Sequence, residues 1–244
     1  MNMFLIDQAF TIRLGCFLGI FLCMAGWEAW APRRKLTQSK SIRWANNLGL
    51  TLFNAILTSI VFSLAAVGAA LLAEERGWGF FNQYPSPIWS KGLISIIVLD
   101  LAIYTQHVIF HKVSIFWRLH RMHHTDLDID VTTGTRFHPV EILLSLLLKM
   151  GIVISLGAPA WSVIIFEVLL NGTSIFNHSN LYMRARSDRL LRLMVVTPDM
   201  HRVHHSVRIR ETDSNFGFNF PWWDRLFQTY QAQPAAGHIN MRIG

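Results

Sequence analysis

The sequence is rich in histidine, and most of its histidines fall into three short clusters. Eight of the eleven histidines form these clusters: His107 and His111; His120, His123 and His124; His201, His204 and His205. Positions i, i+3 and i+4 share one face of a helix, so each cluster can present its rings to one point. A lone histidine on a helix is usually a surface residue, but eight protonated imidazoles held close together would repel one another. Since neutral imidazole is a good ligand for iron, zinc, copper and nickel, the clusters predict a metal centre.

The number and type of these ligands narrow the chemistry. A structural zinc site needs four ligands and commonly uses cysteine, and a haem iron held by two histidines does not need triplets. Soluble di-iron bundles use Glu-x-x-His pairs, which this sequence lacks. Eight or nine nitrogens divided between two ions leave four or five ligands for each ion and an open position. This arrangement favours oxygen activation over metal storage.

The composition indicates a membrane protein. The 244 residues are 52% hydrophobic and 15% charged, with a mean hydropathy of +0.32. Soluble domains carry about 25% charged residues, so a disordered chain, a disulfide-stapled secreted module and an ordinary cytosolic enzyme are excluded. The net charge of +7 fits basic side chains that face anionic headgroups rather than nucleic acid. Cys16 and Cys23 lie in one apolar segment and provide no disulfide framework.

Five apolar segments predict the helices that position the histidines. Three are long enough to span a bilayer, and two shorter ones flank Gly157-Ala158-Pro159, which predicts a tight turn and a helical hairpin. The segments cover residues 11–31, 48–73, 88–111, 140–156 and 161–176. The predicted fold is an all-α polytopic membrane protein with three spanning helices, a helical hairpin and a cytoplasmic helical cap that carries the histidines.

Basic residues predict the orientation. The loop at residues 32–47 holds five lysines and arginines, which places it in the cytoplasm. The amino terminus then lies outside, and the third segment and the hairpin both return the chain to the cytoplasm. The tail at residues 177–244, with its nine arginines, therefore lies inside. We expect a multi-pass protein of the cell inner (plasma) membrane with its metal site on the cytoplasmic side.

One membrane-embedded domain, residues 1–244, is the simplest organisation. Within it we expect the amino-terminal spanning helices in residues 1–87, a catalytic region in residues 88–232 and a tail in residues 233–244.

Longer motifs surround the clusters. They are Asp100-x3-Tyr104-x2-His107-x3-His111, Trp117-Arg-Leu-His120-Arg-Met-His123-His124-Thr125, Arg136-Phe-His138-Pro-Val-Glu141, Phe176-Asn-His178-Ser-Asn180, Thr197-Pro-Asp-Met-His201-Arg-Val-His204-His205-Ser206 and Asn215-Phe-Gly217…Trp223-Asp224-Arg-Leu-Phe227. With these flanks and in this order, the sequence resembles the fatty acid hydroxylase superfamily, the sterol desaturase-like membrane di-iron oxygenases, over residues 98–230.

The resemblance implies a role for each histidine of the motifs. The eight clustered histidines correspond to iron ligands, and His178 matches a further ligand placed before the last cluster. His138 precedes Pro139 at a helix start, where it either caps the helix or supports the ligands from beside them. Val108 is a departure, because many relatives have arginine after the first histidine.

Two polar residues precede the first cluster on its own helix face. Asp100 either orients a ligand histidine, as metal-bound imidazoles usually require, or makes a structural polar contact with another helix. Tyr104 either lines the substrate entrance or packs against a neighbour.

The implied activity is O2-dependent hydroxylation, or desaturation, of a C–H bond in a membrane lipid, either sterol-like or fatty acyl. The implied cofactors are two iron ions, with O2 as co-substrate. Since no flavin, nucleotide or haem motif is present, electrons must come from an external ferredoxin-like or cytochrome-like donor. The alternatives are a zinc-dependent membrane hydrolase, which is expected to need a His-Glu-x-x-His base that is missing, and a non-catalytic metal-binding or redox protein.

Three further patterns give expectations. Asp126, Asp128 and Asp130 lack the glycine and terminal glutamate of a calcium loop, so they predict a solvated turn. Trp222-Trp223 suits either a membrane-interface belt or core packing. Lys149 and Glu167 lie nine residues on either side of Ala158, at equal depth in the hairpin, so they predict an interior ion pair; the alternative is a lysine that snorkels outward.

Overall fold

The protein is built from helices. The computed structural model describes residues 2–62 and 65–244; it is 70% helical and has no strand in those ranges. The helices are α1 (Asn2–Trp30), α2 (Lys40–Val61), α3 (Ala65–Arg76), α4 (Phe80–Gln83), α5 (Ile88–Lys112), α6 (Ser114–His124), η1 (Thr133–Thr135), α7 (Pro139–Leu156), α8 (Ala160–His178), α9 (Ala185–Leu191), α10 (Pro198–His204), α11 (Ile209–Thr212), α12 (Trp222–Leu226) and α13 (Gly237–Asn240).

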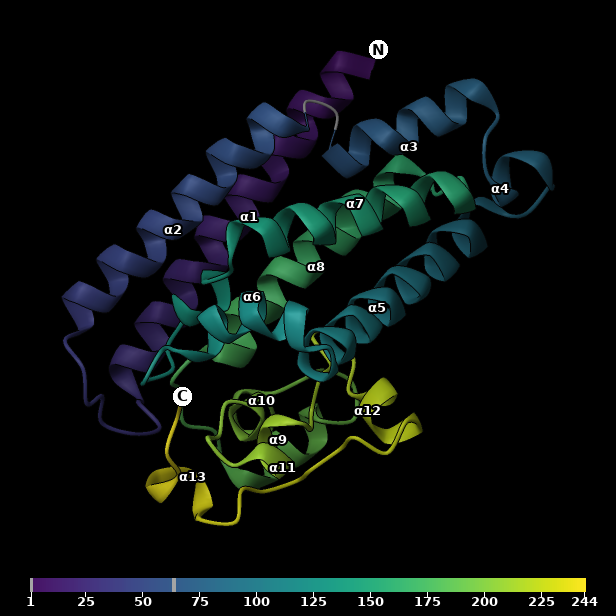
Figure 1. Cartoon of the computed structure of the whole chain (residues 1–244). Coiled ribbons are helices and arrows are strands. Elements are labelled where there is room, and N and C mark those ends of the chain that lie inside the picture. Colours follow the sequence, from purple (N-terminus) through teal and green to yellow (C-terminus); the bar gives the residue numbers. More distant parts are fainter. Residues whose placement is uncertain (1, 63–64) are drawn as a thin grey trace.

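Long and short helices occupy different ends of the molecule. In Figure 1 the long helices α1, α2, α5, α7 and α8 fill the upper part, with the amino terminus at the top. The short helices α9 to α13 form a cap beneath them, where the carboxyl terminus lies, and α6 lies between the two parts. The predicted all-α fold is therefore confirmed. The cap itself carries only the last histidine cluster, because the others lie on α5, α6 and α8. The side of the membrane on which the cap lies stays a prediction.

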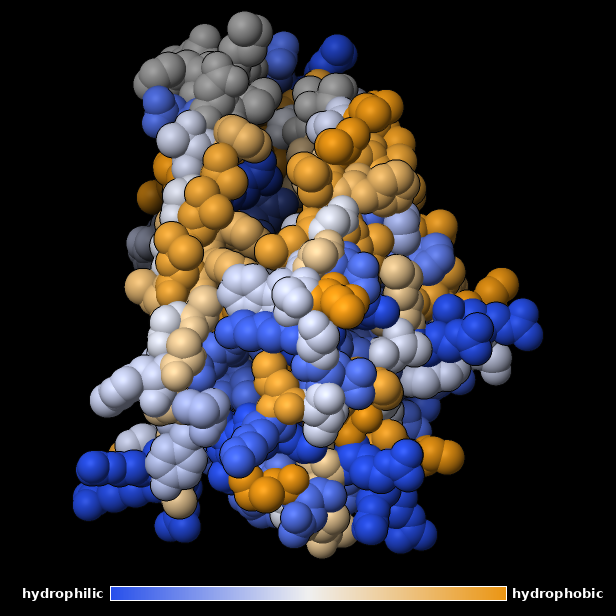
Figure 2. Space-filling view, turned by 90° about the vertical axis from the view of Figure 1, so that its left-hand side faces the viewer, coloured by the Kyte–Doolittle hydropathy of each residue, from blue (hydrophilic) through white to orange (hydrophobic). Residues whose placement is uncertain are grey.

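Five stretches of the described chain are long and apolar enough to cross a membrane, as the segments predict. They are Gln8–Trp30, Lys40–Gln83, Ile88–Lys112, Pro139–Leu156 and Ala160–His178. Their outward side chains are apolar: Leu22 is 68% exposed and Ile60 is 75% exposed. Figure 2 shows apolar residues over the upper part of one face and hydrophilic residues over the lower part. The upper part thus suits a hydrocarbon surrounding, and the cap suits water and headgroups.

The second apolar segment forms two helices instead of the single spanning helix that its length predicts. α2 ends at Val61, and α3 begins at Ala65 with a positive φ of 48°. α3 is rich in alanine, and its Ala66, Ala69 and Ala70 are almost fully buried. Such small side chains let α3 pack closely on α7 and α8, so the chain changes direction and does not continue along α2. No glycine or proline marks this break.

The predicted turn of the hairpin is confirmed. α7 ends at Gly157, whose φ of +65° is left-handed, and Pro159 precedes α8. A Cβ atom on Gly157 would lie 2.9 Å from the backbone carbonyl oxygen of Trp78, so both the backbone conformation and the close approach require glycine. The predicted ion pair is also present, with Lys149 Nζ 3.7 Å from Glu167 Oε1. The sequence did not indicate its third member, Arg13 of α1, which donates to Glu167 Oε2 at 2.5 Å.

The three aspartates after α6 are buried, so the prediction of a solvated turn is wrong. Asp126, Asp128 and Asp130 are at most 5% exposed. Arg43 of α2 donates to both carboxylate oxygens of Asp126, at 2.6 and 2.8 Å, and to Asp130 at 2.5 Å. Asp128 accepts from the backbone N–H of Thr37 at 2.7 Å. The aspartates therefore fasten the segment after the second histidine cluster to α2 and the loop before it.

Candidate metal centre

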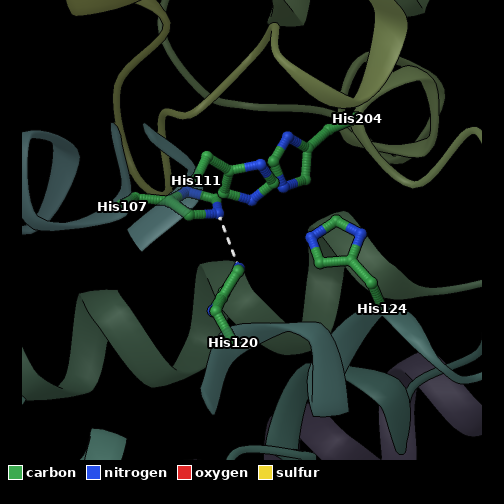
Figure 3. A group of neighbouring side chains, drawn as sticks. All are labelled: His107, His111, His120, His124 and His204. Atoms are coloured by element: carbon green, nitrogen blue, oxygen red, sulfur yellow. Dashed lines mark hydrogen bonds between the residues drawn. The ribbon is translucent and has the colours of Figure 1, made fainter. Parts of the chain in front are cut away.

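Four helices deliver nine histidines to one buried region. α5 carries two of them, α6 carries three, the last residue of α8 is the sixth, and α10 with its C-cap supplies three. They form two groups in which ligand atoms lie within 4.8 Å of one another. The first group is His107, His111, His120, His124 and His204, and the second is His123, His178, His201 and His205. Figure 3 shows the five side chains of the first group pointing toward a common space.

Each triplet cluster divides between the two groups, so the expectation that one cluster faces one point is wrong. On α6, His120 and His124 belong to the first group while His123 belongs to the second. On α10, the division is reversed, because His204 belongs to the first group and His201 to the second, with His205. The i and i+4 positions thus serve one group, and the i+3 position serves the other.

Hydrogen bonds from the protein fix the rings. Backbone carbonyls lie next to the Nδ1 atoms of four histidines: Phe216 O at 2.7 Å from His107, Arg136 O at 3.0 Å from His123, Ser174 O at 2.7 Å from His178 and Ser214 O at 2.8 Å from His204. Glu141 Oε1 lies 2.6 Å from His120 Nδ1. Since a carbonyl or carboxylate only accepts, each of these Nδ1 atoms carries the proton, and each Nε2 presents a bare lone pair.

These lone pairs face one another. His107 Nε2 lies 3.1 Å from His120 Nε2, the contact dashed in Figure 3, and His178 Nε2 lies 3.0 Å from His123 Nε2. With the protons on Nδ1, no hydrogen remains for either contact in neutral rings. Both ring nitrogens of His124 and His205 are buried without a hydrogen-bond partner among the described residues. Burying so many unpaired acceptors is costly unless a cation sits between them.

Protons do not supply that cation. Burial, followed by the charge of neighbouring histidines, lowers the pKa of His120, His124 and His205 well below its usual value. The rings are therefore neutral at neutral pH, which is the state that binds metal. The donor set, all imidazole nitrogen in groups of five and four, fits two metal ions.

A loop from the cap supports the first group. Phe216, whose carbonyl holds His107, donates its backbone N–H to Asp224 at 2.8 Å, and Gly217 donates to the same carboxylate at 2.9 Å. Thr229 also donates to Asp224, and its hydroxyl lies 2.9 Å from that of Tyr104. Tyr104 is 4% exposed and stacks on Phe227, so its contacts are those of a packing residue.

Asp100 and His138 do not touch the nine histidines. Asp100 accepts from the indole N–H of Trp223 at 2.7 Å, a contact between α5 and α12 that fits the structural alternative. Trp223 is half-buried, whereas Trp222 is 37% exposed. His138 caps α7, since its Nδ1 accepts from the backbone N–H of Val140 at 3.1 Å.

The sequence motifs contain Glu141 and Asp224, but no pattern assigned them a role. A glutamate one residue inside a predicted helix start is ordinary, and an aspartate after two tryptophans has no characteristic spacing to the histidines. Their roles depend on contacts with His120 and Phe216 that only the folded chain brings together.

Comparison with known proteins identifies the class. The sequence model described as fatty acid hydroxylase matches residues 92–229, more than half of the chain. The protein therefore belongs to the fatty acid hydroxylase family, and by family it is an oxidoreductase.

Particular relatives act on different lipids according to their names. The chain is 26% identical over 236 residues to ornithine lipid hydroxylase of Rhizobium tropici, covering 93% of this chain and 69% of that protein. It is 24% identical over 183 residues to alkylglycerol monooxygenase of Homo sapiens, covering 72% of this chain and 38% of that protein. With cholesterol 25-hydroxylase of Rattus norvegicus it shares 27% over 192 residues, covering 77% of this chain and 61% of that protein. No solved structure matches significantly.

Proposed function

We propose that this protein is an O2-dependent di-iron hydroxylase of a membrane lipid. The observation that carries the proposal is the pair of buried histidine groups in a chain of the fatty acid hydroxylase family. The proposed ligands are all nine histidines of the two groups: His107, His111, His120, His124 and His204 for one ion, and His123, His178, His201 and His205 for the other. When bound and reduced, two irons supply the power to use O2 against an unactivated C–H bond.

The chain itself contributes geometry and exclusion of water. Five histidines have their Nδ1 protons held by carbonyls or by Glu141, so their Nε2 atoms are aimed before any metal arrives. The buried rings keep the region dry, which prevents side reactions of a reactive oxidant. Asp100, Tyr104 and His138 act at a distance from this region, through packing and capping.

The substrate is proposed to be a lipid with a long hydrocarbon chain, sterol-like or fatty acyl, and the reaction is hydroxylation or desaturation. The names of the relatives support a lipid. An apolar groove of about 350 Å³ between α5 and α7 supports it as well; Val98, Leu147, Leu148, Gly151 and Ile152 are among its lining residues. Val98 lies nine residues before His107, so the groove opens about 13 Å along α5 from the first histidine group.

Electrons are proposed to come from an acidic ferredoxin-like or cytochrome-like donor on the cytoplasmic side. A cavity of about 400 Å³ reaches His111 and is lined by Trp117, Ile209 and Asp213 among others. Exposed arginines flank these lining residues in the chain: Arg118, Arg121, Arg208 and Arg210. Such exposed basic side chains attract an acidic partner. Turnover with a soluble donor should slow as salt rises, and salt-independent turnover would argue against this docking.

The metal assignment is tested by changing one ligand at a time. His124→Ala and His204→Ala are two separate variants. Each should both lower the iron content of the purified protein and abolish lipid oxidation. His138→Ala is the matched control, since this histidine caps α7 and belongs to neither group. The metal content of the purified protein is measured by elemental mass spectrometry. The lipid product is measured by mass spectrometry of lipids from cells with and without the protein. Full activity with His124 or His204 replaced would disprove the assignment.

The same measurements separate the alternatives. A zinc hydrolase would release a hydrolysed lipid without O2, and a metal-binding or redox carrier would yield no changed lipid. The proposed hydroxylase adds one oxygen to a lipid, and a desaturase removes two hydrogens.

A further inference from the structure

Three charged side chains meet inside the apolar part of the molecule, away from the histidines. Glu167 of α8 lies between Arg13 of α1, at 2.5 Å, and Lys149 of α7, at 3.7 Å. Lys149 lies seven residues from the end of α7 at Leu156, so the cluster is about 10 Å from the hairpin turn. It also lies eight residues beyond Glu141, about 12 Å along α7 from the residue that holds His120.

The charges of this cluster do not balance. Arg13 donates to Glu167 and to the carbonyl of Ala9. Lys149 Nζ is too far from Glu167 for a hydrogen bond, and among the described side chains, those of residues 8–62 and 65–244, it has no hydrogen-bond acceptor and no second acidic partner. Among these described side chains two cations therefore share one carboxylate, and the three donors of the ammonium have no acceptor there.

An excess charge is expensive at this depth. Ionisable residues within spanning helices are rare, and they persist where they pair or line a polar path. The two cations are accessible, since the side chains of Arg13 and Lys149 are 26% and 17% exposed, whereas that of Glu167 is 7% exposed. Figure 2 shows hydrophilic atoms at the floor of a hollow in the apolar upper part. The positive members of the cluster thus face outward and the negative member faces inward.

We propose that Arg13 and Lys149 bind the anionic group of a membrane lipid, a phosphate or a carboxylate. Such a group neutralises the excess charge and accepts the free hydrogen bonds of Lys149. A lipid is the source, because the cluster lies within the apolar helices, where the hydrocarbon chains attached to the anionic group can pack against apolar side chains, whereas a free ion from water has no such contacts. The site goes beyond the proposed oxidation and does not depend on it, since none of the nine histidines contributes.

Lipid retention provides the test. The full-length protein is placed in nanodiscs of phosphatidylcholine with a minor fraction of phosphatidic acid. The protein is then released from the nanodiscs under mild conditions, and native mass spectrometry measures its mass together with any lipid that it retains. We expect about one phosphatidic acid retained per chain, and about tenfold less retention in Lys149→Met and in Arg13→Gln. Lys149→Arg should retain the lipid. Lys91→Met is the matched control, because it removes a lysine from another spanning helix whose ammonium donates to Phe81 O.

Two results would overturn the lipid site. One is equal retention of phosphatidic acid by the unchanged protein and by Lys149→Met, and the other is displacement of the lipid by added inorganic phosphate. A melting temperature of Lys149→Met close to that of the unchanged protein shows that lost retention is not lost folding. Arg13→Gln provides the same comparison from a second helix.

Discussion

Arg43→Met is expected to loosen the histidine groups without touching a histidine. Arg43 holds Asp126 through two hydrogen bonds and Asp130 through one, and both aspartates are at most 5% exposed. The segment that they anchor begins directly after His124 and leads to Arg136, whose carbonyl holds His123. Removing the guanidinium leaves two buried carboxylates facing an apolar side chain.

The magnitude follows from this burial. Breaking a buried ion pair by removing one partner costs about 3–5 kcal/mol. In a chain of this size each kcal/mol lowers the melting temperature by about 2–4 °C, so a decrease of about 10 °C is expected. Replacing the aspartates as well, in Arg43→Met/Asp126→Asn/Asp130→Asn, should restore much of the stability because no uncompensated charge remains.

The pH dependence has a definite sign. Burial alone would raise the pKa of Asp126, but the hydrogen bonds and charge of Arg43 outweigh burial and hold this pKa below its usual value. A carboxyl with a lowered folded pKa stabilises the protein above the unfolded value of about 4, and that stabilisation is lost as the pH falls through the folded value. The unchanged protein should therefore lose this contribution below about pH 4.

Thermal melting of the protein in detergent, with iron content measured in parallel, is the assay. Lys40→Met is the matched control on the same helix: Lys40 is exposed, its ammonium lies 4.0 Å from Glu28, and its loss should cost less than about 1 kcal/mol. The reasoning is refuted if Arg43→Met and Lys40→Met have the same melting temperature, or if the triple variant has a lower melting temperature than Arg43→Met alone.

Two further predictions concern single contacts. Glu141→Gln should weaken iron retention about 10–100-fold, because it replaces the carboxyl group that holds His120. Iron left after dialysis against a chelator is the measurement, and exposed Glu75→Gln is the control; equal retention in both variants would contradict this role. Glu167→Leu should be clearly less stable than Lys149→Met. Glu167→Leu leaves Arg13 and Lys149 facing each other without an acidic partner, whereas Lys149→Met keeps the Arg13–Glu167 pair. Equal melting temperatures of the two variants would contradict this order.

The helices and the histidines could be predicted because their signals are local. Apolar runs of sufficient length indicate spanning helices whatever surrounds them. Four of the five runs lie in single helices, and the described part of the second run is divided between α2 and α3. Lys149 and Glu167 can be paired by counting from the turn, since two helices that leave one turn reach equal depth together. Arg13 belongs to another helix, and no count along the hairpin includes it.

Contacts between distant segments were beyond the sequence. Three aspartates alternating with apolar residues look like an exposed turn until Arg43, more than eighty residues earlier, is placed against them. The break between α2 and α3 has the same origin, because an alanine-rich run is a good helix in any surrounding. Only packing against α7 and α8 turns it into a separate helix.

The division of the clusters has a consequence for the chemistry. His123 and His124 are consecutive, as are His204 and His205, and in each pair one ring belongs to each group, with ring centroids 5.4 Å apart. Because the Cα atoms of consecutive residues are about 3.8 Å apart, the side chains of such a pair stay close to each other. The two histidine groups are therefore adjacent where α6 and α10 contribute to them. Two independent structural metal sites would gain nothing from this arrangement. Two adjacent buried sites with only imidazole ligands would hold two metal ions close to each other. This adjacency supports the proposed oxidation more strongly than the number of histidines does.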